Sequence, residues 1–259
     1  MNKKIRNGLL LCIAAVAAGG VSFCGASVYR SRAEQVAPPL PAATAESAVP
    51  ASQAPAADLT AAPAAEPIPI DFAAEQKECA DIYAWLEIPG TKITQPVVQH
   101  PTDDNYYLDY TIDGVKWTDG AIYTELCTAK DFSDFNTVIY GHNMTDDTMF
   151  GGLSAYLDAA YLQAHREIVI YTPSEKRVYR IFAAVVYDDR YLPYAFDQTD
   201  PDDCQLFIDS LSETGNENSQ VLDDVPVGPE SKLLTLSTCY GGRSYPNNRY
   251  LIVAAYEGA

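Results

Sequence analysis

Histidine is scarce in this chain of 259 residues, and the cysteine patterns that usually hold metal ions are missing. The histidines are His100, His142 and His165, so any histidine chemistry has three candidates. No Cys-x-x-Cys pair occurs, and the cysteine spacing fits no zinc site. These absences predict a protein that works without a metal ion or any other cofactor.

The six cysteines are too dispersed to form a disulfide scaffold. Two of them, Cys12 and Cys24, fall inside an apolar N-terminal run. The other four are Cys79, Cys127, Cys204 and Cys239. The sequence alone leaves open whether Cys204 forms a disulfide bridge with Cys79 or with Cys127.

Basic residues are also rare beyond the N-terminus. Residues 1–32 hold five Lys and Arg and no acidic residue, whereas the rest of the chain holds 12 basic and 35 acidic residues, a net charge of −23. A region with this negative charge repels nucleic acid and anionic lipid headgroups. We therefore expect no nucleic-acid partner. The acidity also fits the simpler role of keeping an exported domain soluble.

Residues 8–29 form an apolar run of 22 residues without a charge, after Lys3, Lys4 and Arg6. About 20 apolar residues cross a bilayer as a helix, whereas the apolar part of a cleaved signal peptide usually has about 7–15. The preceding basic residues would keep the amino end in the cytoplasm. The sequence thus predicts that residues 1–32 are a cytoplasmic tip and transmembrane signal anchor, with the rest of a single-pass cell-membrane protein outside the cell. A cleaved signal peptide is the alternative.

Residues 33–70 are mostly Ala and Pro and have too few large apolar side chains to bury. We expect a disordered stalk there. The folded domain is predicted to span residues 71–259.

The pattern of this domain is mainly β. An amphipathic helix is predicted at Asp71–Leu86, with Asp71 as its N-cap, and two further helical stretches at about Met149–Leu162 and Asp202–Leu211. A strand and a Pro-Gly turn are predicted over Glu87–Thr91. The other predicted strands are Val97–Gln99, Ala121–Glu125, Thr137–Tyr140, Glu167–Tyr171, Arg177–Tyr187, Leu233–Ser237 and Tyr250–Tyr256. Many short strands with few helices indicate a closed or nearly closed β-barrel.

Three residues with catalytic potential lie at predicted strand ends. His142 follows a strand and Gly141, and Cys239 ends a run in which Leu233, Thr235, Ser237 and Cys239 share one face. Arg249 starts the last strand after a polar hairpin, so pairing across that hairpin would bring it near Cys239. A guanidinium there would favour the thiolate and could stabilise an oxyanion. Taken singly, each residue also has an ordinary structural interpretation, such as a buried inert thiol.

Seven short segments of the chain form a recognisable set: Tyr140-Gly-His-Asn143, Thr235-Leu-Ser-Thr-Cys239, Asn248-Arg249-Tyr250, Ala84-Trp-Leu-Glu-Ile-Pro-Gly-Thr91, Pro96-Val-Val-Gln99, Tyr106-Tyr-Leu108 and Thr148-Met-Phe-Gly151. Together these segments resemble the sortase family, and class B in particular. They span nearly the whole globular part. The resemblance implies a closed eight-stranded β-barrel with an N-terminal helix and one or two inserted helices.

The resemblance also implies an activity, that of an extracytoplasmic cysteine transpeptidase of Gram-positive cells. Cys239 would attack the threonine carbonyl of a C-terminal sorting signal and form a thioester. His142 would act as acid and base, and Arg249 would stabilise the oxyanion. The partners would be a sorting-signal-bearing surface protein or pilin, an amine from a peptidoglycan precursor or a pilin Lys, and the membrane through the N-terminal helix.

By the same resemblance, five residues are expected to contact the substrate: Leu108, Tyr140, Tyr191, Leu192 and Ser237. Two positions depart from the family pattern. Tyr240 follows Cys239 at a variable position, and Asp104 stands where a polar amide is expected.

Two other functions compete with this interpretation. A papain-like or cell-wall amidase peptidase also needs Cys and His, but nothing around Cys239 matches the local signatures of those enzymes. A non-enzymatic surface-binding module would have an unreactive Cys239.

Overall fold

The computed structural model describes residues 67–241 and 244–258. These residues lie in a compact unit assigned to Thr60–Ala259. The predicted anchor at residues 1–32 and most of the predicted stalk lie outside the described residues. At the end of the predicted stalk, Ile68 and Ile70 are partly buried against the domain.

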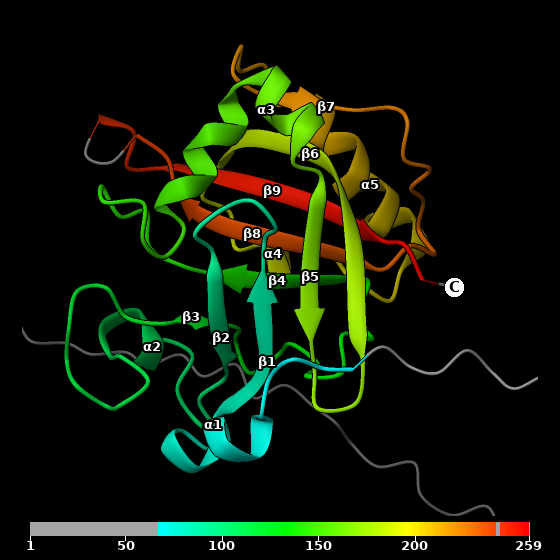
Figure 1. Ribbon diagram of the computed structural model, residues 1–259. Coiled ribbons are helices and arrows are strands. Elements are labelled where there is room, and N and C mark those ends of the chain that lie inside the picture. Colours follow the sequence, from blue (N-terminus) through cyan, green and yellow to red (C-terminus); the bar gives the residue numbers. More distant parts are fainter. Residues whose placement is uncertain (1–66, 242–243, 259) are drawn as a thin grey trace, which may run out of the picture. The chain divides into compact units, whose positions relative to one another are not determined.

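The sheet contains nine described strands, eight of which close into a barrel (Figure 1). Their order is β5-β1-β2-β3-β4-β8-β9-β6-β7, and a further pairing of β5 with β6 closes the ring. The strands are β1 (Ile82–Glu87), β2 (Thr94–Val98), β3 (Ile122–Tyr123), β4 (Asn136–Tyr140), β5 (Glu167–Tyr171), β6 (Lys176–Asp188), β7 (Gln220–Val221), β8 (Leu233–Cys239) and β9 (Asn248–Tyr256). The predicted closed eight-stranded barrel is confirmed, and β7 is an addition to it.

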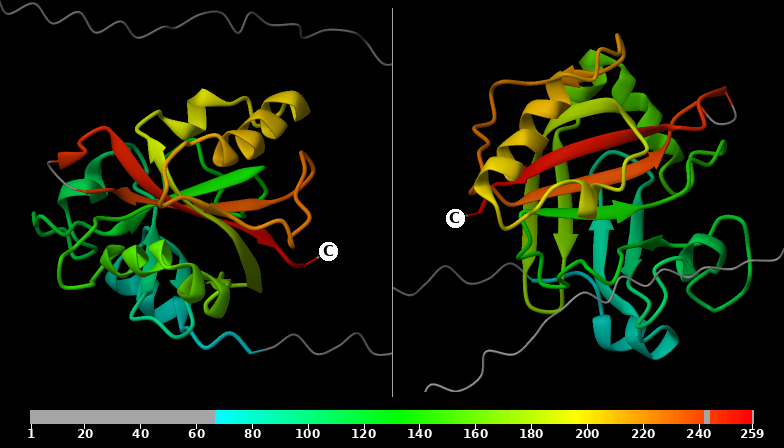
Figure 2. Two further views of the ribbon diagram at one scale, coloured as in Figure 1. Left: turned by 90° about the horizontal axis from the view of Figure 1, so that it is seen from above. Right: turned by 180° about the vertical axis from the view of Figure 1, so that it is seen from behind.

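Short helices cover the barrel. They are α1 (Phe72–Glu78), α2 (Tyr106–Asp109), the 3₁₀ helix η1 (Gly151–Leu157), α3 (Ala159–Ala164), α4 (Leu192–Ala195) and α5 (Pro201–Ser212). Figures 1 and 2 show α5 against the outer side of the wall formed by β6, β8 and β9, and α1 below β1. The two helical stretches predicted at about Met149–Leu162 and Asp202–Leu211 are therefore present.

The predicted N-terminal helix is too long. Asp71 does cap it, because its side chain accepts a hydrogen bond from the Ala74 amide, but the helix ends at Glu78. Residues 82–87 form β1, which pairs with β2 on one side and with β5 on the other. Ile82, Tyr83 and Trp85 favour a pleated strand, and these two partners outweigh the helical spacing of the segment.

The barrel interior is one apolar cluster to which all eight barrel strands contribute. Leu234 and Leu236 of β8 point into it. Leu233 belongs to a second cluster, on the outer face, with residues of α4 and α5. The alternation predicted for this strand is therefore present, and it places Ser237 and Cys239 on the outer face of the barrel wall.

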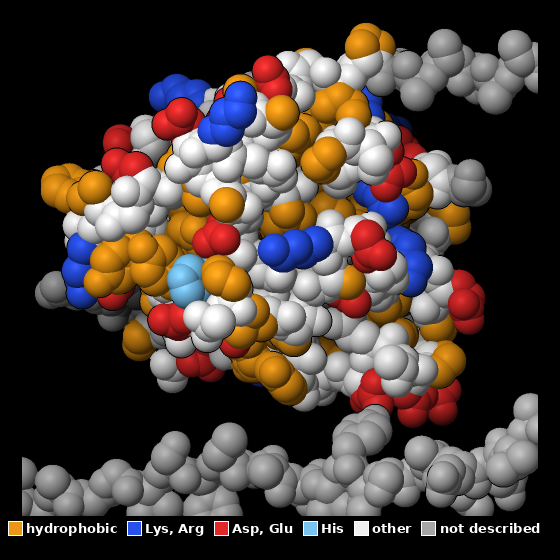
Figure 3. Space-filling model, turned by 90° about the horizontal axis from the view of Figure 1, so that it is seen from below, with side chains coloured by type: hydrophobic (Ala, Val, Ile, Leu, Met, Phe, Trp, Pro, Cys, Tyr) orange, Lys and Arg blue, Asp and Glu red, His pale blue; other side chains and the backbone are white. Residues whose placement is uncertain are grey.

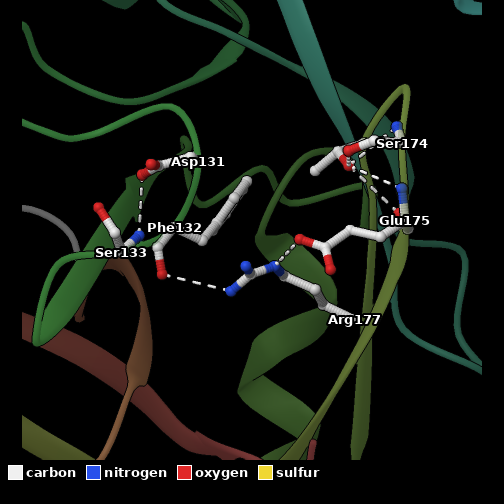
Figure 4. Close-up of polar contacts among 7 residues, drawn as sticks. Asp131, Phe132, Ser133, Ser174, Glu175 and Arg177 are labelled. Carbon is white, nitrogen blue, oxygen red and sulfur yellow. Dashed lines mark hydrogen bonds and ion pairs between the residues drawn. The ribbon is translucent and has the colours of Figure 1, made fainter. Parts of the chain in front are cut away.

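A loop before β4 is fixed by the β5–β6 hairpin (Figure 4). The buried Phe132 has a φ of 56°, a conformation that is unusual for a bulky residue. Arg177 donates a hydrogen bond of 3.3 Å to the Phe132 carbonyl and pairs with Glu175 at 2.6 Å. These contacts stabilise the loop that leads into β4.

The predicted localisation needs correction. Among residues 67–241 and 244–258, no helix is long and apolar enough to cross a membrane. This finding contradicts the predicted single-pass membrane topology, which we withdraw. The apolar run on which that prediction depended lies outside the described residues.

Charged side chains are dispersed on the face of the domain seen from below. The Lys and Arg side chains stand apart from one another there, with acidic side chains between several of them (Figure 3). Apolar side chains fill patches between them. The net negative charge of the chain is thus not offset on this face by one continuous basic surface.

Candidate active site

The β8–β9 hairpin places Cys239 directly opposite Arg249. The two strands are antiparallel, and their register pairs Ser237 with Leu251, Thr238 with Tyr250 and Cys239 with Arg249. Residues directly opposite each other in such a pair have Cβ atoms about 4.5–5.5 Å apart. The proximity predicted from the hairpin is therefore present in the register.

The β4–β8 pair brings His142 to the same edge. These strands are parallel neighbours, with Tyr140 beside Ser237, and the Gly141 amide donates a 3.2 Å hydrogen bond to the Ser237 carbonyl. A Cβ on Gly141 would lie 2.7 Å from the buried Phe150 ring, so packing excludes a larger residue there. Asn143 then donates a 2.7 Å hydrogen bond to the Cys239 carbonyl and ties the two segments together.

A cavity of about 300 Å³ lies over this edge, on the outer face of β4, β8 and β9. All eight residues singled out from the sequence line it: Leu108, Tyr140, His142, Tyr191, Leu192, Ser237, Cys239 and Arg249. The structure thus brings together residues from five separate segments of the chain. Their chemical roles stay predictions.

The side chains around the cavity differ in exposure. Cys239 is exposed, whereas Cys79 and Cys204 are buried, so Cys239 is not the inert core thiol of the structural alternative. Leu108 and Tyr191 are 40% and 41% exposed. Leu192 is only 7% exposed and belongs to the outer apolar cluster, so most of its surface packs against the domain.

His142 and Arg249 are each bonded to backbone carbonyls. Nε2 of His142 lies 2.8 Å from the Leu108 carbonyl oxygen. Since a carbonyl oxygen only accepts, Nε2 carries a proton in this arrangement. Nη1 of Arg249 donates to the carbonyls of Asn248 and Pro246, at 3.2 and 3.4 Å. Among the described residues, no hydrogen bond joins Cys239, His142 and Arg249 to one another.

Glu125 also lines the cavity and was not among the predicted site residues. Glu125 is 7% exposed, and its pKa is raised to about 7, chiefly by burial. The nearby Asp104 carboxylate contributes to this rise, while the hydrogen bond from Tyr191 opposes it. Asp104 itself accepts a hydrogen bond from the Leu126 amide. The sequence signal for Glu125 was an acidic residue at the end of a predicted strand, which is too common to be specific.

No disulfide bridge forms among the four described cysteines, which are all free. Cys79 lies in the apolar cluster under α1, and Cys204 lies on α5 in the cluster on the other outer face. The bridges left open by the sequence are therefore absent. The described residues also contain no group of three or more His, Cys, Asp or Glu side chains that could hold a metal ion.

Comparison with known proteins identifies this arrangement. The family model of the sortase domain matches residues 86–257. Sortase B of Listeria monocytogenes is 33% identical over 180 residues, which cover 68% of this chain and 70% of that protein. Sortase B of Staphylococcus aureus is 29% identical over 185 residues, covering 71% and 73%.

Solved structures agree in fold. The 2.0 Å crystal structure of Staphylococcus aureus Sortase B superposes with a TM-score of 0.63 at 27% identity and covers 73% of this chain and 87% of that one. The Clostridium perfringens Sortase B structure gives 0.64 at 24% identity, covering 72% and 100%, a likeness that supports the fold. By the domain match and these relatives, the chain belongs to the sortase family of cysteine transpeptidases, in its class B branch.

Proposed function

We propose that this protein cleaves a C-terminal sorting signal after its threonine and transfers the new acyl group to an amine. The observation that carries the proposal is the position of an exposed thiol, Cys239, on a cavity that His142 and Arg249 also line. Its acceptor would be an amine of a cell-wall precursor or of a pilin subunit.

The first half-reaction would form an acyl-enzyme. The Cys239 thiolate, paired with a protonated His142 imidazolium, attacks the threonine carbonyl carbon, and the oxyanion accepts hydrogen bonds from Arg249. As the peptide C–N bond breaks, His142 donates its Nε2 proton to the leaving amine. The product is a thioester between Cys239 and the threonine.

The second half-reaction reverses these roles. An incoming amine attacks the thioester, His142 removes a proton from it, and the C–S bond breaks to release the Cys239 sulfur. A thioester persists until a good nucleophile arrives, and an amine is a better nucleophile than water. Transfer is therefore favoured over hydrolysis when an acceptor amine is bound.

Substrate binding must exchange three hydrogen bonds of the free protein. His142 would leave the Leu108 carbonyl, and Arg249 would turn from the carbonyls of Asn248 and Pro246. All three bonds are to neutral backbone acceptors on the surface, so an oxyanion or a substrate amide can replace them at small net cost. The backbone geometry that brings the three residues together needs no change.

Structures of relatives support the two classes of substrate. One solved structure is a Staphylococcus aureus sortase B–substrate complex, with a TM-score of 0.62 and 26% identity to this chain. Another is Sortase B complexed with triglycine, with a TM-score of 0.63 and 27% identity. For this chain we infer a sorting signal of the Asn-Pro-x-Thr or Leu-Pro-x-Thr kind and a primary amine acceptor.

Peptide cleavage with and without an amine tests the proposal. Quenched peptides with Asn-Pro-Ala-Thr and Leu-Pro-Ala-Thr cores should be cleaved, and added triglycine should divert the acyl product from acid to amide, as followed by mass spectrometry. Cleavage that triglycine neither accelerates nor diverts would favour a hydrolytic peptidase. Undiminished turnover by Cys239→Ala would end the proposal.

A further inference from the structure

Three segments of the chain meet at one buried carboxylate on the cavity wall. Glu125 follows β3, Tyr140 ends β4, and Tyr191 lies just before α4. The Tyr191 hydroxyl donates a hydrogen bond to Oε2 of Glu125, and the Tyr140 side chain lies near this carboxylate. All three residues line the cavity that holds Cys239.

The Glu125 end of this contact is fixed. The buried side chain of Gln99 donates to the backbone carbonyls of Glu125 and Thr128, at 2.7 and 2.9 Å. The neighbouring Thr124 side chain is bonded to the buried Tyr83 hydroxyl at 2.9 Å. Glu125 therefore stands on a rigid part of the barrel wall.

The Tyr191 end is held by fewer interactions. Tyr191 is 41% exposed and lies in the segment Asp188–Leu192, which leaves the end of β6 and forms one side of the cavity. Its ring stacks on that of Tyr194, which is 73% exposed. The hydroxyl bond to Glu125 thus joins a surface segment to the rigid wall across the cavity.

We propose that Glu125 is a positioning residue that clamps Tyr191, and with it the Asp188–Leu192 wall of the cavity, at the spacing that a bound sorting peptide requires. The clamp acts through Tyr191 and takes no part in bond making. That the cavity binds a sorting peptide rests on the function proposed above.

The groups around the carboxylate favour this role over that of a general base. Tyr191 donates a hydrogen bond to Glu125, while Tyr140, Tyr123, Asp104 and Cys127 lie close enough to interact with its charge. Hydrogen bonds to the ionised form are stronger than those to the neutral form. The clamp should therefore be tighter when Glu125 is ionised.

Two substitutions break the clamp from its two ends. Tyr191→Phe removes only the hydroxyl, and Glu125→Gln removes the charge while keeping the shape. Tyr194→Phe is the matched control, because it removes a hydroxyl from the adjacent stacked ring, which does not line the cavity.

The first measurement is hydrogen–deuterium exchange of residues 188–195 in the free enzyme, which needs no substrate. Tyr191→Phe and Glu125→Gln should each speed exchange of this segment severalfold, while Tyr194→Phe leaves it unchanged. Equal exchange in all the variants would overturn the clamp, whatever the enzyme's activity.

The second measurement is binding of the fluorescent Asn-Pro-Ala-Thr and Leu-Pro-Ala-Thr peptides to Cys239→Ala protein carrying each substitution. Either single substitution should weaken binding of the better peptide roughly tenfold, the size expected on losing a charge-assisted hydrogen bond, and the double variant should be no weaker. Fully additive losses would overturn the clamp, since they would mean that the two residues act separately. If neither peptide binds while the exchange results hold, the clamp stands and the proposed substrate falls.

Discussion

At the scale of single residues, three side chains from distant parts of the sequence depend on backbone register for their proximity. Cys239 and Arg249 face each other across β8 and β9, and His142 follows the strand parallel to β8. Sequence alone could predict this group because each member lies at a strand end next to a recognisable segment. It could not predict the present hydrogen bonds of His142 and Arg249, which depend on loop conformation.

Single substitutions at these residues should separate their roles. Cys239→Ala should abolish transpeptidation, and His142→Ala should nearly do so. Arg249→Ala should lower kcat about 10²–10³-fold, as does loss of one oxyanion donor elsewhere. Steady-state kinetics with the quenched peptides would measure this, and Arg249→Lys would show whether charge alone suffices. An Arg249→Ala enzyme with unchanged kcat would contradict the oxyanion role.

Glu125 should make stability depend on pH. Its pKa is raised in the folded protein from an ordinary 4.5 to about 7, so the folded state binds this proton more tightly than the unfolded state does. The more tightly bound proton therefore adds to the free energy of unfolding below pH 4.5. This contribution, of about 1–3 kcal/mol, is lost as pH rises from 4.5 to 7.

Glu125→Gln should remove that dependence. The Tm of the variant minus that of the wild type should rise by several degrees between pH 5 and pH 8, at roughly 2–4 °C per kcal/mol. Calorimetry at both pH values would measure it, with the exposed Glu230→Gln as the control. A difference in Tm that stays constant with pH would show that Glu125 ionises normally.

At the scale of elements, the sequence predicted long, regular strands better than short, irregular ones. β5 was predicted to the residue, and the division of β8 into two faces was predicted, but not which of them points inward. β1 was taken for the end of a helix, because its apolar spacing suits both structures and pairing with β2 and β5 decides between them. The two-residue β7 and the one-turn helices α2 and α4 carry too few residues for any periodicity to show.

The link between β8 and the segment after β4 can be tested at Asn143. Asn143→Ala removes the 2.7 Å hydrogen bond to the Cys239 carbonyl without touching the interior of the barrel. We expect roughly tenfold lower kcat/KM, as for loss of one hydrogen bond, with little change in Tm. Thr145→Ala, an exposed change in the same loop, is the control. Wild-type kinetics for Asn143→Ala would show that the link is unimportant.

At the scale of the whole molecule, the domain consists of an apolar barrel interior and two separate outer clusters. The closed barrel follows from the number of short strands and from the family resemblance. The position of the cavity outside the barrel could not be predicted from the sequence, because it depends on which face of β8 the helices α4 and α5 cover. The two outer clusters also bury different cysteines.

Thiol labelling of the native protein should show which cysteines are buried in these outer clusters. Cys239 and Cys127 are exposed and should react with iodoacetamide first, whereas Cys79 and Cys204 should react only on unfolding. Peptide mapping by mass spectrometry would give the order, and labelling in urea would give the control for intrinsic reactivity. Early modification of Cys204 would mean that α5 opens away from the barrel in solution.

The placement of the cavity outside the barrel has a consequence for how such enzymes diversify. The side chains that hold the eight strands together point away from the cavity, while the segments that border it, such as Asp188–Leu192, belong to the covering layer. Natural variation can therefore reshape the recognition surface with little penalty to folding. A chain built this way can acquire a new peptide preference by exchanging its outer loops and keep its inherited interior.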